Sequence, residues 1–149
     1  METLKEFEAF RREQESWWFV ARRKLLHDTL ARALYGKNEA RVLDLGGAAQ
    51  LEGADFSIRV LNAHWSFPVL AFNQIHGARN QICTRMDELG LASNTFDAIV
   101  SGDLLQFAPD DLAVIRELRR VLKDGGLLCL TVPAYDFLWG EEDEARGHQ

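Results

Sequence analysis

The chain of 149 residues has few cysteines and no long hydrophobic run. Its two cysteines, Cys83 and Cys129, have no second Cys or His at the spacing of a metal or redox motif. We expect both to be buried, reduced thiols of a cytoplasmic protein. No apolar run approaches the roughly 20 residues that span a bilayer, and the charged opening from Met1 to Lys5 is unlike a secretory signal. No membrane partner is therefore expected.

Several signatures of functional sites are also missing. The four histidines, His27, His64, His76 and His148, lie far apart in the sequence, so no metal site is predicted. The sequence contains neither the Gly-x-Ser-x-Gly turn of hydrolases nor a Gly-Lys-Ser/Thr phosphate loop. With 17 basic and 23 acidic residues, the net charge of −6 argues against a nucleic-acid partner, because phosphate binding needs a basic surface.

The most informative stretch is Arg41-Val-Leu-Asp-Leu-Gly-Gly47. Its apolar part, Val42 to Leu45, predicts a short buried strand, and Gly46-Gly47 predicts a tight turn with backbone angles that favour glycine. A nucleotide-binding α/β domain begins in this way, with its ligand beyond the carboxyl ends of parallel strands. The three-glycine dinucleotide fingerprint is absent, because Ala48, Ala49 and Gln50 follow.

The rest of the pattern alternates strands with helices. We predict a helical segment that Ser16 divides in two and Gly36 ends, strands over 57–62, 81–86, 96–103 and 127–132, and helices over 66–77 and 109–122. Near-continuous apolar strands of this kind form parallel sheets covered on both faces. The predicted fold is one domain, 1–149: a helical segment, 1–36, before a doubly wound, Rossmann-like α/β core of about five mainly parallel strands, 37–149.

Two aromatic or imidazole features each have two interpretations. The Trp17-Trp-Phe19 cluster either packs against the sheet, which we favour, or forms a lid over a ligand. His64 follows the second predicted strand, where it is either a general base or, as we prefer, a surface or supporting histidine.

The second half of the chain resembles one known family closely. The segments Phe96-Asp-Ala-Ile-Val100, Leu112-Ala-Val-Ile-Arg-Glu-Leu-Arg-Arg-Val-Leu122 and Lys123-Asp-Gly-Gly-Leu-Leu-Cys-Leu-Thr-Val-Pro133 are similar to those of class I S-adenosylmethionine-dependent methyltransferases, in particular the small-molecule group. Near the start, Trp17-Trp-Phe with Ala21-Arg-Arg23 resembles the "WWFxARR" of that group. The resemblance implies a methyltransferase fold, S-adenosylmethionine as cofactor and methyl transfer to a small molecule.

The resemblance also implies where the cofactor binds. Its binding residues would be the eight at matching positions: Asp44, Gly46, Gly47, Asn62, Arg85, Met86, Asp103 and Leu104. No catalytic residue is identified, because methyl transfer depends mainly on positioning.

Four parts of the expected cofactor site depart from the family pattern. Ala48 and Gln50 replace glycines of the cofactor loop, and Asn62 stands where an acid usually ends the second strand and accepts the ribose hydroxyls. Arg85 replaces an Asp that commonly faces the adenine, and Gln106-Phe107 replaces a Glu-His pair. Unpaired buried polar groups cost about 1–3 kcal/mol each, so we expect impaired cofactor binding.

Three hypotheses on function follow. The first is a methyltransferase that still uses S-adenosylmethionine, and the second is a non-catalytic homologue that acts as a binding or partner subunit. A nicotinamide-dinucleotide binder ranks far lower, because the fingerprint is missing. The family usually continues beyond Gln149 with two more strands, so we expect Leu127 to Val132 to be an exposed edge that pairs in a homodimer or with a partner.

Overall fold

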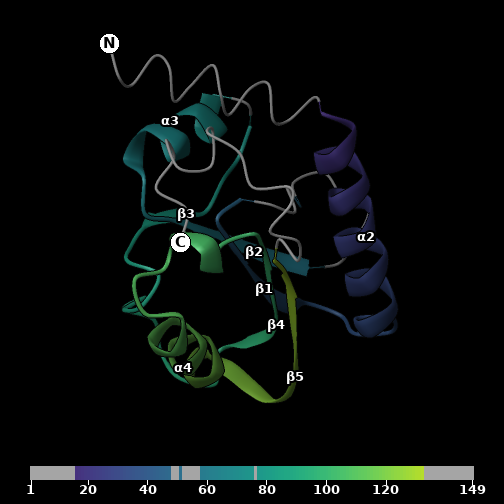
Figure 1. Cartoon of the computed structure of the whole chain (residues 1–149). Helices are drawn as coiled ribbons and strands as arrows, with labels where there is room; N and C mark the ends of the chain where they lie inside the picture. Colours follow the sequence, from purple (N-terminus) through teal and green to yellow (C-terminus); the bar gives the residue numbers. More distant parts are fainter. Residues whose placement is uncertain (1–15, 48–50, 52–57, 76, 133–149) are drawn as a thin grey trace.

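The protein is described by a computed structural model, which places residues 16–47, 51, 58–75 and 77–132. Figure 1 shows a central sheet with helix α2 on one face and helix α4 on the other. The sheet has five strands in the order β3-β2-β1-β4-β5, and every neighbouring pair is parallel. The predicted parallel, doubly wound α/β fold is therefore confirmed.

The three central strands follow the predicted apolar runs closely. They are β1 (Ala40–Leu45), β2 (Ile58–His64) and β4 (Phe96–Gly102). In β1, all residues but one are buried, because neighbouring strands pair on both sides and helices cover both faces. Leu43 and Leu45 belong to the core beneath α4, whereas Ala40 and Val42 belong to the core beneath α2. This alternation follows from the two-residue period of a strand.

Helix α2 (Trp17–Ala33) covers one face of the sheet. Its buried residues, Arg22, Leu26 and Leu30, recur every fourth position, which places them on one side of the helix. The two leucines pack with Val42 and Val100 in one core cluster. This stripe also brings one arginine against the sheet.

The other face is covered by α4 (Asp111–Val121), whose buried residues are Val114, Leu118 and Val121. Asp110 caps this helix: its side chain accepts a hydrogen bond from the N–H of Ala113 at 2.9 Å. Helix α3 (Phe67–Ile75) packs against β2 and β3, and a 3₁₀ turn, η1 (Leu105–Phe107), follows β4.

Several predictions of detail are wrong. Strand β3 (Gln81–Cys83) is shorter than predicted, and β5 (Leu122–Thr131) begins earlier, because Lys123 to Gly126 continue into the strand. Cys83 ends an edge strand and is exposed, not buried, while Cys129 is partly buried. Burial raises the pKa of the Cys129 thiol.

The preferred interpretation of the tryptophans is also wrong. Trp17 is 77% exposed and Trp18 is 51% exposed. Trp17 lies off the stripe of buried residues on α2, and Trp18, four residues before Arg22, is in line with the stripe but exposed in the first turn of the helix, so neither is buried against the sheet. Instead, the two rings contact each other edge to face at 5.9 Å.

Within the described residues, β5 pairs only with β4 and forms one edge of the sheet, and β3 forms the other. No helix in this part of the chain is long and apolar enough to cross a membrane.

Candidate functional site

The candidate site lies at the carboxyl edge, defined here as the side of the sheet where β1, β2 and β4 end at Leu45, His64 and Gly102. The predicted turn after β1 is present, because Gly46 and Gly47 have φ angles of 89° and 70°. Such angles disfavour any side chain that carries a Cβ. The chain therefore leaves β1 by a path that brings its backbone to the site.

Asp44 and Asn62 lie side by side just inside this edge. They are register partners on β1 and β2, and both are buried. The amide of Asn62 donates a hydrogen bond from Nδ2 to the carbonyl of Arg79 at 3.1 Å. Asn62 therefore uses a donor to hold the segment before β3 in place.

The end of β2 differs from the prediction in its position. The strand does not end at Asn62 but continues to His64, which is therefore the side chain at the carboxyl edge. Residue 62 is two positions inside the strand, beside Asp44. A role of Asn62 in sugar binding stays a prediction.

His64 is buried and neutral. Burial lowers its pKa from 6.5 to about 4, and the N–H of Ser66 donates a hydrogen bond to Nδ1 at 2.8 Å. Because Nδ1 accepts this bond, the single proton of the neutral ring resides on Nε2. His64 therefore offers a donor at the place where an acid would offer acceptors. Of the preferred interpretation, a surface or supporting histidine, the surface position is wrong and the supporting role stays a prediction.

Trp65 covers the glycine turn. Its ring stacks on His64 with centroids 4.1 Å apart and contacts Phe107 at 5.7 Å. A Cβ built on Gly46 would lie 3.8 Å from this indole and 3.7 Å from the side chain of Leu104. Trp65 and Leu104 thus line the space over Gly46, whereas Ala48 and Gln50, which replace glycines of the loop, lie outside the described residues.

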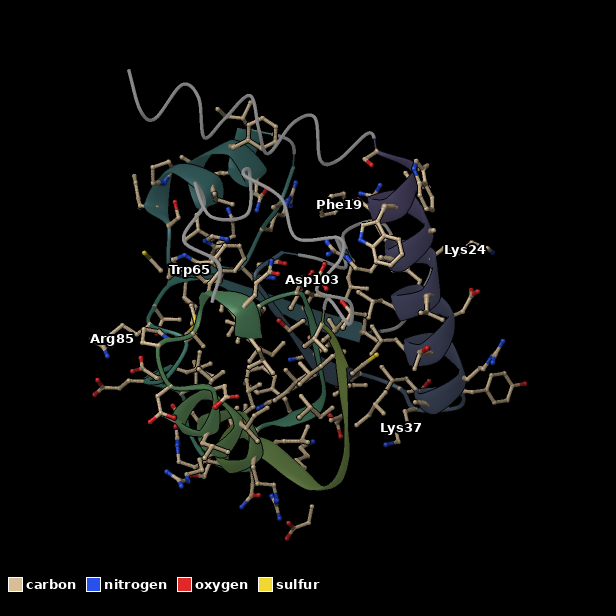
Figure 2. All side chains as sticks on the ribbon, viewed as in Figure 1. Phe19, Lys24, Lys37, Trp65, Arg85 and Asp103 are labelled. Carbon is tan, nitrogen blue, oxygen red and sulfur yellow. The ribbon has the colours of Figure 1, made fainter. Side chains whose placement is uncertain are left out.

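Asp103 follows β4 and is held on both carboxylate oxygens. It has a φ angle of 52°, its Oδ2 accepts from the guanidinium of Arg22, and its Oδ1 accepts from the hydroxyl of Thr131 at 2.9 Å. Its N–H donates to the carbonyl of Thr131 at 2.8 Å. Figure 2 shows Asp103 and Trp65 in the same region, between α3 and α2. Asp103 therefore joins α2, β4 and β5 at the carboxyl edge.

Arg22 is the residue that the sequence interpretation missed. Its side chain is only 8% exposed, and its guanidinium lies 4.3 Å above the ring of Phe19. Within the described residues, its buried Nε has no hydrogen-bond partner. The signal was present in the sequence, because Arg22 lies four residues before Leu26 and eight before Leu30 on the apolar stripe.

Arg85 and Met86 differ in their placement. Met86 is buried in the core beneath α4. Arg85 is exposed and forms a two-bond ion pair with Asp87, at 3.0 and 2.7 Å, which raises the pKa of Arg85 and lowers that of Asp87. Figure 2 shows its side chain on the outer surface, away from Asp103. The predicted site residues thus converge at Gly46, Leu104 and Asp103, whereas Arg85 lies apart.

The part of the chain that is described contains no group of three His, Cys, Asp or Glu side chains that could hold a metal ion. The site is therefore built from backbone, aromatic rings and one ion pair.

The lowered pKa of His64 makes stability depend on pH. Below pH 6.5 the unfolded chain binds a proton that the folded chain does not bind until about pH 4, so stability falls across this interval. We expect the free energy of unfolding to drop by about 2 kcal/mol more between pH 7.5 and pH 5 in the native chain than in His64→Gln. Urea denaturation measures the difference. Nuclear magnetic resonance signals of the His64 ring that titrate near pH 6.5 would contradict the assignment.

The Arg22–Asp103 pair is expected to contribute strongly to stability, because breaking a buried pair leaves an uncompensated charge. Arg22→Met and Asp103→Asn should each cost about 3 kcal/mol, and the double variant less than their sum. The exposed pair of Lys24 and Asp28, 3.8 Å apart on the same helix, is the control and should contribute less than about 0.5 kcal/mol. If the losses of stability in the double-mutant cycle of Arg22 and Asp103 are additive, the two charges do not interact.

Comparison with known proteins agrees with this architecture. A family model described as a methyltransferase domain matches residues 36–130. The chain is 28% identical over 120 residues to 2-methyl-6-phytyl-1,4-hydroquinone methyltransferase 1 of Oryza sativa subsp. japonica, covering 75% of this chain and 36% of that protein. The chain spans about a third of the length of the curated relatives it matches.

Solved structures show the same fold. Phosphoethanolamine N-methyltransferase 2 of Haemonchus contortus, in complex with S-adenosyl-L-methionine, superposes with a TM-score of 0.65 at 22% identity, over 84% of this chain and 33% of that one. The complex of a methyltransferase with the Trm112 methyltransferase activator, from Haloferax volcanii, gives 0.64 at 21% identity, over 86% and 65% of the two chains. At these identities the likeness concerns the fold alone. Because the family model matches more than half of its residues, this chain belongs to the methyltransferase domain family.

Proposed function

We propose that this chain is a methyltransferase core that binds S-adenosylmethionine at the carboxyl edge with reduced affinity and methylates a small molecule. The observation that carries the proposal is the combination of a positive-φ glycine turn with His64 as a buried donor at the end of β2. The turn keeps the backbone path that the family uses, whereas the donor replaces an acceptor for the sugar. The family relative that acts on a hydroquinone supports a small-molecule acceptor.

The residues fit the two ends of the cofactor unequally. Arg22 and Asp103 carry one positive and one negative charge at the carboxyl edge, which complements the zwitterionic amino-acid end of the cofactor. At the adenosine end, His64 offers Nε2–H, and Arg85 is paired with Asp87 on the surface, so neither supplies an acceptor there. The cofactor would therefore be held mainly through the glycine turn, Arg22 and Asp103.

Catalysis in such a site depends on position and on exclusion of water. When bound, S-adenosylmethionine supplies an electrophilic methyl group. The protein's contribution is to orient the acceptor in line with it and to keep solvent away. Trp65, Leu104 and Phe107 form an apolar wall at this edge that can exclude water. No side chain is assigned as a general base, because His64 has its Nδ1 occupied by Ser66.

A non-catalytic subunit is the second candidate, and one observation favours it. The charges of Arg22 and Asp103 pair with each other, and the Trp65 indole lies beside Gly46, so these two charges need no ligand to neutralise them. Binding measurements distinguish the two candidates.

Affinity for S-adenosylmethionine and S-adenosylhomocysteine is expected to be weak. If the loss of one hydrogen-bond acceptor weakens the binding free energy by about 2 kcal/mol, a dissociation constant of about 1 μM rises to about 30 μM. Calorimetry on the native chain should therefore give a dissociation constant of tens of micromolar or higher. Binding at low micromolar would contradict the impaired site, and no binding at millimolar concentration would favour the non-catalytic subunit.

Restoring variants sharpen this test. His64→Asp returns two acceptors to the end of β2 and should tighten binding at least fivefold, whereas Asn62→Asp, two residues inside the strand, should not. Gly46→Ala should abolish cofactor binding, because the φ angle of 89° at this position disfavours a residue with a Cβ. Gly90→Ala is the matched control for backbone strain, because Gly90 has a φ angle of 66° and open space around it. Circular dichroism confirms that each variant folds.

A second part of the proposal concerns association and location. We infer that the edge formed by β5 pairs with a second copy or with a partner subunit, since an unpaired strand edge offers free hydrogen-bonding groups. The activator complex of a methyltransferase of similar fold supports a partner. The free thiols of Cys83 and Cys129 support a reducing, cytoplasmic compartment.

Mass measurement tests the association. We expect a dimer by light scattering at micromolar concentration, and Val132→Lys should reduce it, because a charge at the exposed end of this edge opposes pairing. Leu112→Lys, on the exposed side of α4, is the control and should leave the dimer intact. A monomeric mass for the native chain would overturn the homodimer.

A further inference from the structure

The first turns of α2 are attached to the sheet differently from the rest of the helix. Leu26 and Leu30 are buried in the core cluster beneath α2, and Leu34, which follows the helix, joins them there. Before Leu26, the one described residue of the helix that is buried is Arg22. The leading turns, defined here as residues 17–22, are therefore anchored by a charged side chain and not by an apolar one.

The other side chains of the leading turns bury little area. Phe19 is half-buried, and the remaining four are exposed: Trp17, Trp18, Val20 and Ala21. Figure 2 shows Phe19 on the side of α2 toward Asp103, and Lys24 on the opposite side. Because hydrophobic stabilisation is roughly proportional to the apolar area removed from water, it holds the leading turns less firmly than the turns from Leu26 onward.

The start of α2 also lacks the local features that stabilise a helix end. Ser16 is the N-cap residue, but its side chain makes no capping hydrogen bond with the described part of the chain. The first turn has no acidic residue to complement the positive end of the helix dipole. Helix ends without such support open at a lower free energy than the packed centre of the helix.

The ion pair of Arg22 with Asp103 is thus the main attachment of the leading turns to the described sheet. The guanidinium also lies 4.3 Å from the centre of the Phe19 ring, and Thr131 holds the second carboxylate oxygen of Asp103. Yet the buried Nε of Arg22 has no hydrogen-bond partner among the described residues. An incompletely bonded buried charge offsets part of the stabilisation that the pair provides, so the attachment is easily released.

We propose that the leading turns of α2 form a flap over the carboxyl edge and that the Arg22–Asp103 pair is its latch. When the latch is closed, the two charges neutralise each other and Asp103 is shielded. When it opens, residues 17–22 leave the sheet while Leu26 and Leu30 stay packed, and both charges reach solvent. The entry of a zwitterionic ligand through this opening rests on the proposed function, whereas the opening itself does not.

Hydrogen exchange in the ligand-free chain tests the opening. The N–H of Val20 donates to the carbonyl of Ser16 at 3.0 Å, and the amides that follow in a helix bond in the same way. Opening removes these bonds, so the amides of residues 20–24 should exchange about tenfold faster than those of residues 30–33, after correction for intrinsic rates. The faster exchange should not depend on urea below the unfolding transition, because a local opening exposes little surface.

Variants separate the latch from global stability. Asp103→Asn should speed exchange at residues 20–24 about tenfold, and Phe19→Leu, which keeps both charges but removes the ring beside the guanidinium, about threefold. Asp28→Asn removes the exposed partner of Lys24 on the same helix and should change these rates less than about twofold. Val114→Ala weakens the core beneath α4, so it should speed exchange at residues 30–33 and leave residues 20–24 unchanged.

Two results would overturn the flap. The first is exchange at residues 20–24 that rises with urea and with Val114→Ala in parallel with residues 30–33, because the leading turns would then open only in global unfolding. The second is unchanged exchange at residues 20–24 in both Asp103→Asn and Phe19→Leu, because the pair would then not hold the leading turns closed.

Two nucleosides separate the flap from the proposed function. At equal saturation, S-adenosylhomocysteine should slow exchange at residues 20–24 several-fold more than 5′-methylthioadenosine, which lacks the amino-acid end that would pair with Arg22 and Asp103. Equal slowing by the two would overturn entry of the ligand through the flap. If neither nucleoside binds, the proposed function fails, while urea-independent exchange in the ligand-free chain would still establish the flap.

Discussion

The buried ion pair between Arg22 and Asp103 is the interaction on which the organisation of the carboxyl edge depends. It joins residues 81 positions apart in sequence, and Thr131 extends it to β5. Burying either charge alone would be costly, so α2 and the end of β4 must dock together. The pair thereby fixes α2, which precedes the sheet, to the carboxyl edge.

The same region shows how a family fold can keep its backbone while its recognition chemistry changes. Gly46 and Gly47 have the positive φ angles of a glycine turn after β1. Around them lie the Nε2 donor of His64 and the indole of Trp65, which stacks on His64 and lies beside Gly46. Because methyl transfer depends on positioning rather than on catalytic side chains, such changes affect binding before they affect chemistry.

Much of the fold could be predicted because its signals are local. Apolar runs ending in glycine identified β1 and β4, and the Pro109-Asp-Asp start with its periodic leucines identified α4. The prediction was wrong where tertiary placement decides exposure. Trp17 and Trp18 are apolar but exposed in the first turn of α2, and Cys83 is exposed because β3 is a short edge strand. The site was predicted less completely for two reasons. Strand β2 ends at His64 and not, as predicted, at Asn62. In addition, no local sequence pattern indicates that Arg22 pairs with Asp103, which is far away in the sequence.

The central claim is that the chain's own side chains fill the nucleoside position at the carboxyl edge. A crystal structure of the chain with S-adenosylhomocysteine tests it most directly, by the position of the Trp65 indole relative to Gly46. We predict that any bound nucleoside displaces this ring from its present contact. Adenosine seated beside Gly46 with the indole still within van der Waals contact of that glycine would contradict the claim.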